Sequence, residues 1–257
     1  MAAESPRTTL NRAALVRILS ETVPEPIDPH YDLGERLGQW LDVTTALTLY
    51  SALNNSAGAK PAAPAGSESA APSLPEQLAK VRQQLSDAIL HDGVFSAAPA
   101  RIRFPLPPPA AAPGVADFTP YHSYYLAHQR EMSAAIDALR AKARKALATG
   151  AAPLRQLAEV DAIFEHALHA QERHLLGMIP LLVAKRFDQR YQDHRAILSD
   201  TDNDAPEAWV QPGGWLEAFC RDVQAVLLAE LELRLKPVAG LIAALGTGPD
   251  HLPKMTQ

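Results

Sequence analysis

The chain has a single cysteine, Cys220, among its 257 residues, and this scarcity excludes an intrachain disulfide. Aromatic residues are also few, at 6% of a chain that is 47% hydrophobic, so the core must consist mainly of Leu, Ala, Val and Ile. Such a composition suits helix packing better than a β-sandwich, which is enriched in β-branched and aromatic residues. The lack of disulfides fits a reducing compartment and we expect a cytoplasmic protein, although a periplasmic protein without disulfides would fit as well.

Long hydrophobic runs are absent as well. The longest uncharged apolar run, Leu175–Ala184, is about half of the roughly 20 residues that a transmembrane helix needs. Near the N-terminus, Arg12 and Arg17 interrupt the apolar residues, which is unlike a signal peptide. The sequence therefore predicts no transmembrane segment and no cleaved leader.

Basic residues are not in excess, since 24 Lys and Arg stand against 29 Asp and Glu for a net charge of -5. Phosphate neutralisation favours a basic surface, so we expect no nucleic acid as the main partner. Weak nucleic-acid binding through basic helix ends remains an alternative. We interpret both basic clusters as solvated helix faces, and the first lies where cations complement the helix dipole. The clusters are Arg140, Lys142, Arg144 and Lys145, and Lys185, Arg186, Arg190 and Arg195.

Catalytic motifs are missing too. The chain has no glycine-rich phosphate loop, no Gly-x-Ser-x-Gly and no dinucleotide-binding fingerprint. Cys220 has no histidine that can be identified as its partner, so we interpret it as a buried, inert thiol. The sequence thus predicts no catalytic residue and no cofactor, and it favours a protein that is not an enzyme.

What the chain does have is apolar residues that recur at helical spacing. Most of its 22 prolines are clustered between these helical segments rather than scattered. Ser73 and Glu76 have the spacing of a capping box before one of the predicted helices. Another begins at Asp32, and its stripe of apolar residues is expected to be half-buried: Leu33, Leu37, Trp40, Leu41, Thr44 and Leu47. The predicted helices span residues 9–21, 32–53, 75–92, 119–148, 153–197 and 214–245.

The predicted fold is all-α. Residues 119–198 should form a long antiparallel helical hairpin, because only a short connection separates its two helices. The hairpin and the C-terminal helix carry wide leucine stripes, as in coiled coils, and should form a bundle. Pro180 and Pro237 fall inside long helices, and we expect Pro180 to cause a kink and Pro237 either to kink or to restart its helix.

The composition also predicts the organisation of the chain. Two stretches rich in Ala and Pro are interpreted as linkers, the first of them disordered, because they cannot bury enough apolar surface. In order, we expect an N-terminal helical pair (1–53), a disordered linker (54–73), a short helix (74–92), a Pro-rich irregular segment (93–118), the bundle core (119–246) and a frayed tail (247–257).

One helical face gathers potential metal ligands, namely Asp161, Glu165, His169 and Glu172. Di-metal helical bundles bind their ions through carboxylates and Glu-x-x-His pairs from several helices, and no such pair occurs at this spacing. We therefore interpret the face as solvated and predict no metal. A metal-dependent or small-molecule enzyme that uses these groups remains the alternative.

The acidic segment around Asp200, Asp202 and Asp204 is similar to the start of a calcium-binding loop. Ala205 stands where the turn glycine is required, and Gln211 stands where the bidentate glutamate is required. An acidic surface loop is therefore the interpretation.

Aromatic residues mark the surfaces that we expect to pack or interact. Trp209 and Trp215 bracket a Gln-Pro-Gly-Gly turn before the last helix. The best candidate for a ligand-facing surface is the cluster of Tyr121, His122, Tyr124, Tyr125 and His128, interpreted first as the aromatic end of a helix seam. The residues expected to carry packing or interaction are Trp40, Tyr121, Tyr125, Trp209, Trp215, Phe219, Leu227 and Leu231.

Three segments, at residues 36–53 (RLGQWLDVTTALTLYSAL), 182–189 (LVAKRFDQ) and 209–245, resemble an uncharacterised proteobacterial family that is catalogued as a domain of unknown function. This family has no assigned activity and no recognised catalytic residues. The resemblance implies genes beside envelope proteins of the MotA/TolQ/ExbB-like and OmpA-like kinds, and hence an accessory role in an envelope-associated assembly. The leading hypothesis is a non-enzymatic helical interaction protein that binds a protein partner or itself.

Overall fold

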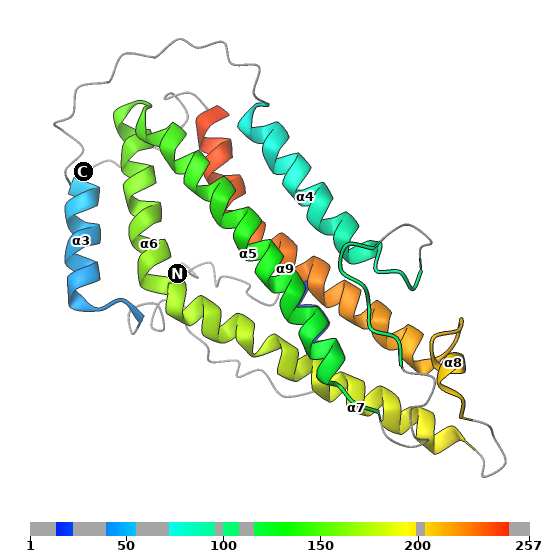
Figure 1. Cartoon of the computed structure of the whole chain (residues 1–257). Coiled ribbons are helices and arrows are strands. Elements are labelled where there is room, and N and C mark those ends of the chain that lie inside the picture. The colour runs from blue at the N-terminus through cyan, green and yellow to red at the C-terminus, as the bar shows by residue number, and fades with distance from the viewer. Residues whose placement is uncertain are drawn as a thin grey trace, which may run out of the picture. The chain divides into compact units, whose positions relative to one another are not determined.

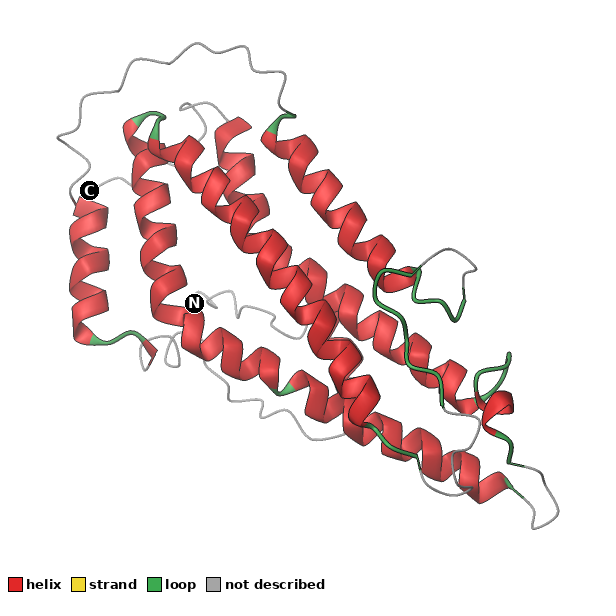
Figure 2. Ribbon diagram, viewed as in Figure 1, coloured by secondary structure: helices red, strands yellow, loops and turns green. Residues whose placement is uncertain are grey.

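The computed structural model describes residues 14–22, 40–54, 72–95, 100–107, 116–198 and 204–246. Its regular elements are α-helices, and the described residues contain no strand, which confirms the all-α prediction (Figures 1 and 2). None of these helices is both long and apolar enough to cross a membrane. The helices are α1 (Ala14–Thr22), α3 (Val43–Asn54), α4 (Leu74–Leu90), α5 (Thr119–Ala148), α6 (Ala152–Gly177), α7 (Ile179–Ile197), α8 (Pro206–Trp209) and α9 (Trp215–Gly246).

Several predicted features lie outside the described residues. They are most of the linker at 54–73, part of the Pro-rich segment at 93–118, the tail at 247–257, the helix start at Asp32 with Leu33 and Leu37, and Asp200 and Asp202 of the acidic segment.

Short polar side chains begin the helices by binding amides that have no partner within the helix. At α4 the predicted capping box is confirmed: the Ser73 amide donates to Glu76 Oε2 at 2.7 Å, and the Glu76 amide donates to Ser73 Oγ at 3.4 Å. At α3 the Thr45 amide donates to Asp42 Oδ1 at 2.6 Å. This bond lowers the pKa of Asp42, and the capping bond from Ser73 does the same for the pKa of Glu76.

The single helix predicted over 153–197 is in fact two helices. α6 ends at Gly177, Met178 forms a turn, and α7 begins at Ile179 with Pro180 in its first turn. Proline has no amide hydrogen to continue a helical ladder, whereas the first turn of a helix requires none. Pro237 behaves differently, because α9 continues through it from Trp215 to Gly246.

α3 packs through a different face from the predicted one. Leu47, expected to be half-buried, is 63% exposed. On the opposite face, Thr45 and Leu49 are half-buried and Ala52 is buried. α3 lies alongside α6 (Figure 1), and Gln156 Nε2 of α6 donates to the Ala52 carbonyl at 3.1 Å.

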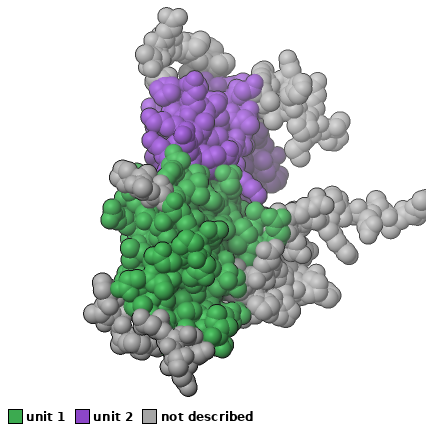
Figure 3. Space-filling view, turned by 90° about the vertical axis from the view of Figure 1, so that its right-hand side faces the viewer, with its two compact units in different colours: residues 1–27, 85–131, 178–233 green, residues 28–84, 132–177, 234–257 purple. Residues whose placement is uncertain are grey.

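The chain divides into two compact units, which Figure 3 colours separately. Unit 1 comprises residues 1–27, 85–131 and 178–233, and unit 2 comprises residues 28–84, 132–177 and 234–257. α4, α5 and α9 each contribute residues to both units.

Each unit has a core of its own. In unit 2 the second half of α5 presents a buried stripe at helical spacing, and the end of α9 adds further buried aliphatic side chains. These residues are Ile136, Leu139, Ala143, Leu147, Leu235, Val238, Leu241 and Ile242. In unit 1 the core follows α9 and is richer in rings, with Leu216, Phe219, Val223, Val226, Leu227 and Leu231 all at most 2% exposed.

The two glycines of the turn before α9 have different roles, and we predict that their alanine variants differ in stability. Gly213 has a φ of +89° with open space around it, so Gly213→Ala should cost about 1–2 kcal/mol of backbone strain. A Cβ at Gly214 would overlap the Trp209 carbonyl and lie 2.7 Å from the Ala208 carbonyl oxygen. Gly214→Ala should therefore lower the free energy of unfolding by about 3 kcal/mol or more.

Urea unfolding monitored by circular dichroism measures both variants against the wild type. Equal losses of stability in the two variants would contradict the separate roles.

Candidate functional site

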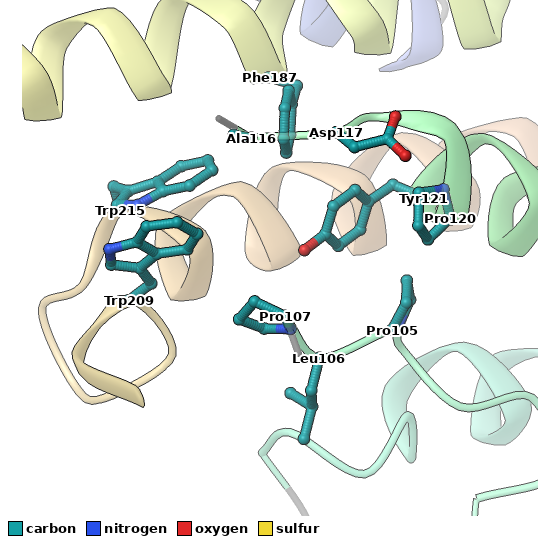
Figure 4. A pocket seen from close by; sticks show the side chains of 10 residues that line it. All are labelled: Pro105, Leu106, Pro107, Ala116, Asp117, Pro120, Tyr121, Phe187, Trp209 and Trp215. Carbon is teal, nitrogen blue, oxygen red and sulfur yellow. The ribbon is translucent and has the colours of Figure 1, made fainter. Parts of the chain in front are cut away.

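An arc of aromatic rings in unit 1 lines one side of a cavity of about 200 Å³ (Figure 4). Tyr121, Phe187, Trp215 and Trp209 follow one another around the arc, with successive ring centroids 5.1, 5.3 and 5.4 Å apart. The segment Pro105–Pro107 faces the rings across the cavity. The remaining lining residues are Ala116, Asp117 and Pro120.

Four helices supply the rings of the arc. Tyr121 lies in the first turn of α5, Phe187 lies on α7, Trp209 ends α8 and Trp215 begins α9. Each ring is at most 7% exposed, and neighbouring rings meet at tilted or near-perpendicular angles, which is the favoured geometry for aromatic pairs. The turn at 210–214 brings the two indoles together, because it reverses the chain between α8 and α9.

A half-buried aspartate, Asp204, holds Trp209 in place. Asp204 Oδ1 accepts hydrogen bonds from Trp209 Nε1 at 2.6 Å and from His194 Nε2 at 2.8 Å. Burial acts to raise the pKa of Asp204, but these two bonds and the charge of Arg195 outweigh it and lower that pKa. The His194 ring also stacks on Trp215, with centroids 6.1 Å apart. Asp204 is therefore engaged by side chains, which differs from its predicted place on an acidic surface loop.

Tyr121 supplies the polar group that points into the cavity. Its hydroxyl is directed toward the two indoles, as Figure 4 shows. Burial raises the pKa of Tyr121 above its ordinary value, so the hydroxyl stays protonated. The Asp117 carboxylate turns away and accepts a hydrogen bond from the Thr119 amide at 2.9 Å, which caps α5. The lining is therefore mainly apolar and aromatic, with the Tyr121 hydroxyl pointing into the cavity and the Trp215 Nε1 buried without a hydrogen-bond partner among the described residues.

The aromatic cluster predicted at 121–128 is divided between this cavity and the buried core. Tyr121 lines the cavity, and His122 is half-buried. The Tyr125 hydroxyl donates to Glu230 Oε2 at 2.7 Å, and the Tyr124 ring lies 4.6 Å from the His128 ring, centroid to centroid. Tyr124, Tyr125 and His128 therefore pack in the buried interior of unit 1.

Unit 1 also contains a buried polar cluster around Asp92, which is 1% exposed. Asp92 Oδ2 accepts hydrogen bonds from Cys220 Sγ at 3.0 Å and from Gln224 Nε2 at 2.9 Å, and Oδ1 accepts one from the Val94 amide at 2.9 Å. Burial, reinforced by the Asp92 carboxylate, raises the pKa of the Cys220 thiol well above its ordinary value. A thiol in this state is a poor nucleophile.

His128 lies near Asp92 and is 2% exposed. Its Nε2 and the Tyr124 hydroxyl are buried without a hydrogen-bond partner in the described part of the chain. Burial lowers the pKa of His128 from 6.5 to about 4, and the Asp92 charge opposes this only in part. His128 is therefore neutral at physiological pH.

Two of the candidate metal ligands form ion pairs across the α5–α6 hairpin. Arg140 donates through Nη2 to Asp161 Oδ1 at 2.6 Å and through Nε to Oδ2 at 2.9 Å, and Arg144 donates to Glu165. His169 and Glu172, the other two candidates, are exposed. In the described residues, no group of three or more His, Cys, Asp or Glu side chains could hold a metal ion.

The second basic cluster is also engaged within the chain. Arg186 Nε and Arg190 Nε donate to Asp222 Oδ2 at 2.8 and 3.0 Å. These two arginine side chains are 22% and 31% exposed, whereas Lys185 and Arg195 of the same cluster are exposed, so the face that the sequence predicted to be solvated is solvated only in part. For the α5–α6 ion pairs, one sequence signal was available. Arg140 and Arg144 are four residues apart, as are Asp161 and Glu165 on the other side of the short turn, so each pair lies on one face of its helix.

Comparison with known proteins identifies one family. A family model described as a protein of unknown function (DUF3348) matches residues 1–247. No curated protein and no solved structure matches the chain. The predicted resemblance to an uncharacterised family is thereby confirmed at the level of the family, and the match transfers no activity.

The buried thiol generates a prediction about chemical reactivity. We expect Cys220 in the folded protein to resist Ellman's reagent, because the thiol is fully buried and its pKa is raised. In denaturant one thiol per chain should react at once, since Cys220 is the only cysteine. Fast stoichiometric reaction of the native protein would contradict this assignment.

His128 generates a prediction about pH. Its pKa is lower in the folded chain than in the unfolded chain, so the unfolded chain binds more protons between these values, and stability must fall as the pH falls. From pH 6.5 to pH 4, where the folded pKa lies, His128 should account for a loss of about 3 kcal/mol.

His128→Phe keeps a ring against Tyr124 and removes the titrating group. The difference in unfolding free energy between wild type and variant, measured in urea at several pH values, isolates the histidine from the carboxylates. A difference that does not change between pH 7 and pH 4 would contradict a neutral buried His128.

Proposed function

The chain belongs to the DUF3348 family, and we propose that it is a non-enzymatic interaction protein that binds an apolar helix of a partner through α3. The best-fitting occupant of that surface is a second copy of the same chain.

The observation that carries the proposal is an exposed, uncharged stripe on α3. Val43, Leu47 and Tyr50 are 77%, 63% and 68% exposed, and their spacing of four and three residues places them on one side of the helix. We call these three residues the α3 stripe. The opposite side of α3 packs on α6, so the helix has two apolar faces, and among the residues that the structure describes only one of them is covered.

The composition of α3 strengthens this argument. Its sequence, VTTALTLYSALN, contains no Asp, Glu, Lys or Arg. A helix that leaves one side in water normally carries charged residues on that side, whereas a helix without them is typical of a buried position. Exposed apolar residues that are aligned rather than scattered mark an interaction surface.

The lack of charge also restricts the partner. Membrane-surface helices attract anionic lipids through Lys and Arg on their polar face, and nucleic-acid surfaces require basic residues, so neither fits α3. A neutral apolar helix fits best. A second copy supplies one, because twofold symmetry places the same self-complementary patch on both sides of an interface.

The α3 stripe is small beside the roughly 800 Å² per partner of a standard interface, so the association should be weak and dependent on concentration. An apolar helix of an envelope-associated assembly, which the family resemblance implies, is the alternative occupant of the same stripe.

Other observations favour interaction over chemistry. The candidate metal ligands Asp161 and Glu165 are already paired with arginines, and the Cys220 thiol is buried. Arg186 and Arg190, the candidates for phosphate contact on α7, pair with Asp222.

We predict that Leu47→Glu abolishes self-association, because each interface would then bury a carboxylate without a partner. Light scattering after size-exclusion chromatography should show a concentration-dependent dimer for the wild type and a monomer for the variant. Leu175→Glu is the matched control and should still form the dimer. It makes the same change at a residue of α6 that is 51% exposed and lies off the α3 stripe.

A mixture of two variants tests whether the partner is a second copy of the chain. Leu47 lies near the middle of α3, where a twofold axis would bring equivalent residues together, so Leu47→Glu and Leu47→Lys chains should form a mixed dimer. A wild type that stays monomeric at every concentration contradicts self-association. A dimer that Leu47→Glu leaves intact contradicts the role of α3.

A further inference from the structure

We infer that the cavity of unit 1 is a binding site for a single aromatic ring that carries one polar substituent, such as a phenol. This inference concerns a different surface from the α3 stripe and does not depend on it.

The size of the cavity limits the ligand to one ring. Its volume is about 200 Å³. An apolar protein cavity of about 150 Å³ is large enough to bind benzene. Sites for larger ligands are typically about 300–1,000 Å³, so the volume of this cavity favours a small ligand with one ring.

The walls favour an aromatic guest. The faces and edges of Tyr121, Phe187, Trp209 and Trp215 form the arc, and each ring is already in contact with the next. A further ring placed inside the arc would meet several rings at the offset and edge-to-face geometries that aromatic pairs prefer. Rigid rings also resist collapse into the space, because they have few rotatable bonds and are tightly packed on their outer sides.

The polar groups around the cavity select the substituent. No Lys, Arg or His is among the described residues that line it, so these residues offer an anionic ligand no counter-charge. The Asp117 carboxylate points away and caps α5, so a cation lacks one as well. The Tyr121 hydroxyl, which points into the cavity, can both donate and accept a hydrogen bond. A neutral hydroxyl or amide group on the ring matches it.

The site is also held rigid from behind, which favours binding without rearrangement. Asp204 fixes the Trp209 indole through a 2.6 Å hydrogen bond, and His194, bonded to the same carboxylate, stacks on Trp215. These contacts join α7 to the residues before α8 and α9, all within unit 1.

The test uses the full-length chain and two fluorinated probes, 4-fluorophenol and fluorobenzene, followed by ¹⁹F NMR titration. The wild type should bind both saturably. Tyr121→Phe keeps the ring and removes the hydroxyl, so it should weaken 4-fluorophenol binding about tenfold, the value of one hydrogen bond, and leave fluorobenzene binding unchanged. This split between probes would not arise from general destabilisation.

A second variant fills the space. Ala116 lines the cavity, and Ala116→Trp should abolish binding of both probes. Ala141→Trp is the matched control, because it adds the same side chain at an exposed position of α5 in unit 2 and should bind like the wild type. Circular dichroism shows whether each variant is folded. If Ala116→Trp does not fold, the comparison of the two probes with Tyr121→Phe tests the inference instead.

Capped tyrosine amide separates the two sources of such a ring. Binding of this probe as tightly as 4-fluorophenol assigns the site to a tyrosine side chain of a protein, whereas binding of 4-fluorophenol alone assigns it to a free small molecule. Failure of the wild type to bind either fluorinated probe, or equal binding by wild type and folded Ala116→Trp, overturns the inference.

Discussion

The hydrogen bonds that the buried carboxyl group of Glu230 requires constrain how α5 and α9 pack in unit 1, because this residue is 0% exposed. Burying a charged or polar group costs several kcal/mol unless hydrogen bonds compensate. Glu230 accepts them from the Tyr125 hydroxyl at 2.7 Å and from Gln129 Nε2 at 3.0 Å. Both donors lie on α5, one turn apart, so satisfying them fixes the rotation and the register of α5 against α9 in this unit. Leucine contacts alone would tolerate other registers, since apolar packing is not directional.

The cavity follows from that register. Tyr121 precedes Tyr125 by one helical turn, and it therefore lies on the same side of α5, facing α9. There its ring meets Phe219 and Phe187, with centroids 5.7 and 5.1 Å away. The Asp92 cluster fixes α9 against α4 in a similar way. Gln224 of α9 donates hydrogen bonds both to Asp92 and to the Ile89 carbonyl at the end of α4. Polar groups that must be satisfied inside the protein thus position the rings that line the candidate site.

The sequence predicts those parts of the structure that depend on local rules. The capping box at Ser73 and the stripe on the second half of α5 follow from spacing alone. Periodicity shows which residues share a face, but not which face is covered, and this is why α3 was misjudged: without charged residues, nothing marks its solvent side. The arginine–carboxylate pairs of the hairpin depend on how near α5 and α6 come to each other. The cavity could not be predicted from the sequence, because its lining residues, such as Pro105 and Phe187, are far apart in the chain and come to line the same space only in the tertiary fold.

The distribution of aromatic residues explains why the cavity stays open. The chain has 15 aromatic residues (6 Phe, 6 Tyr and 3 Trp), and nine of them belong to the network of ring contacts in unit 1, which leaves aliphatic side chains to fill unit 2. Leucine and methionine adapt to irregular spaces by rotating about several bonds, whereas rings are planar and stiff. A core built from rings therefore keeps gaps that an aliphatic core would close, and the cost of such a gap depends on how far its walls can relax. A planar aromatic ligand can fill such a gap without displacing the ring side chains that line it.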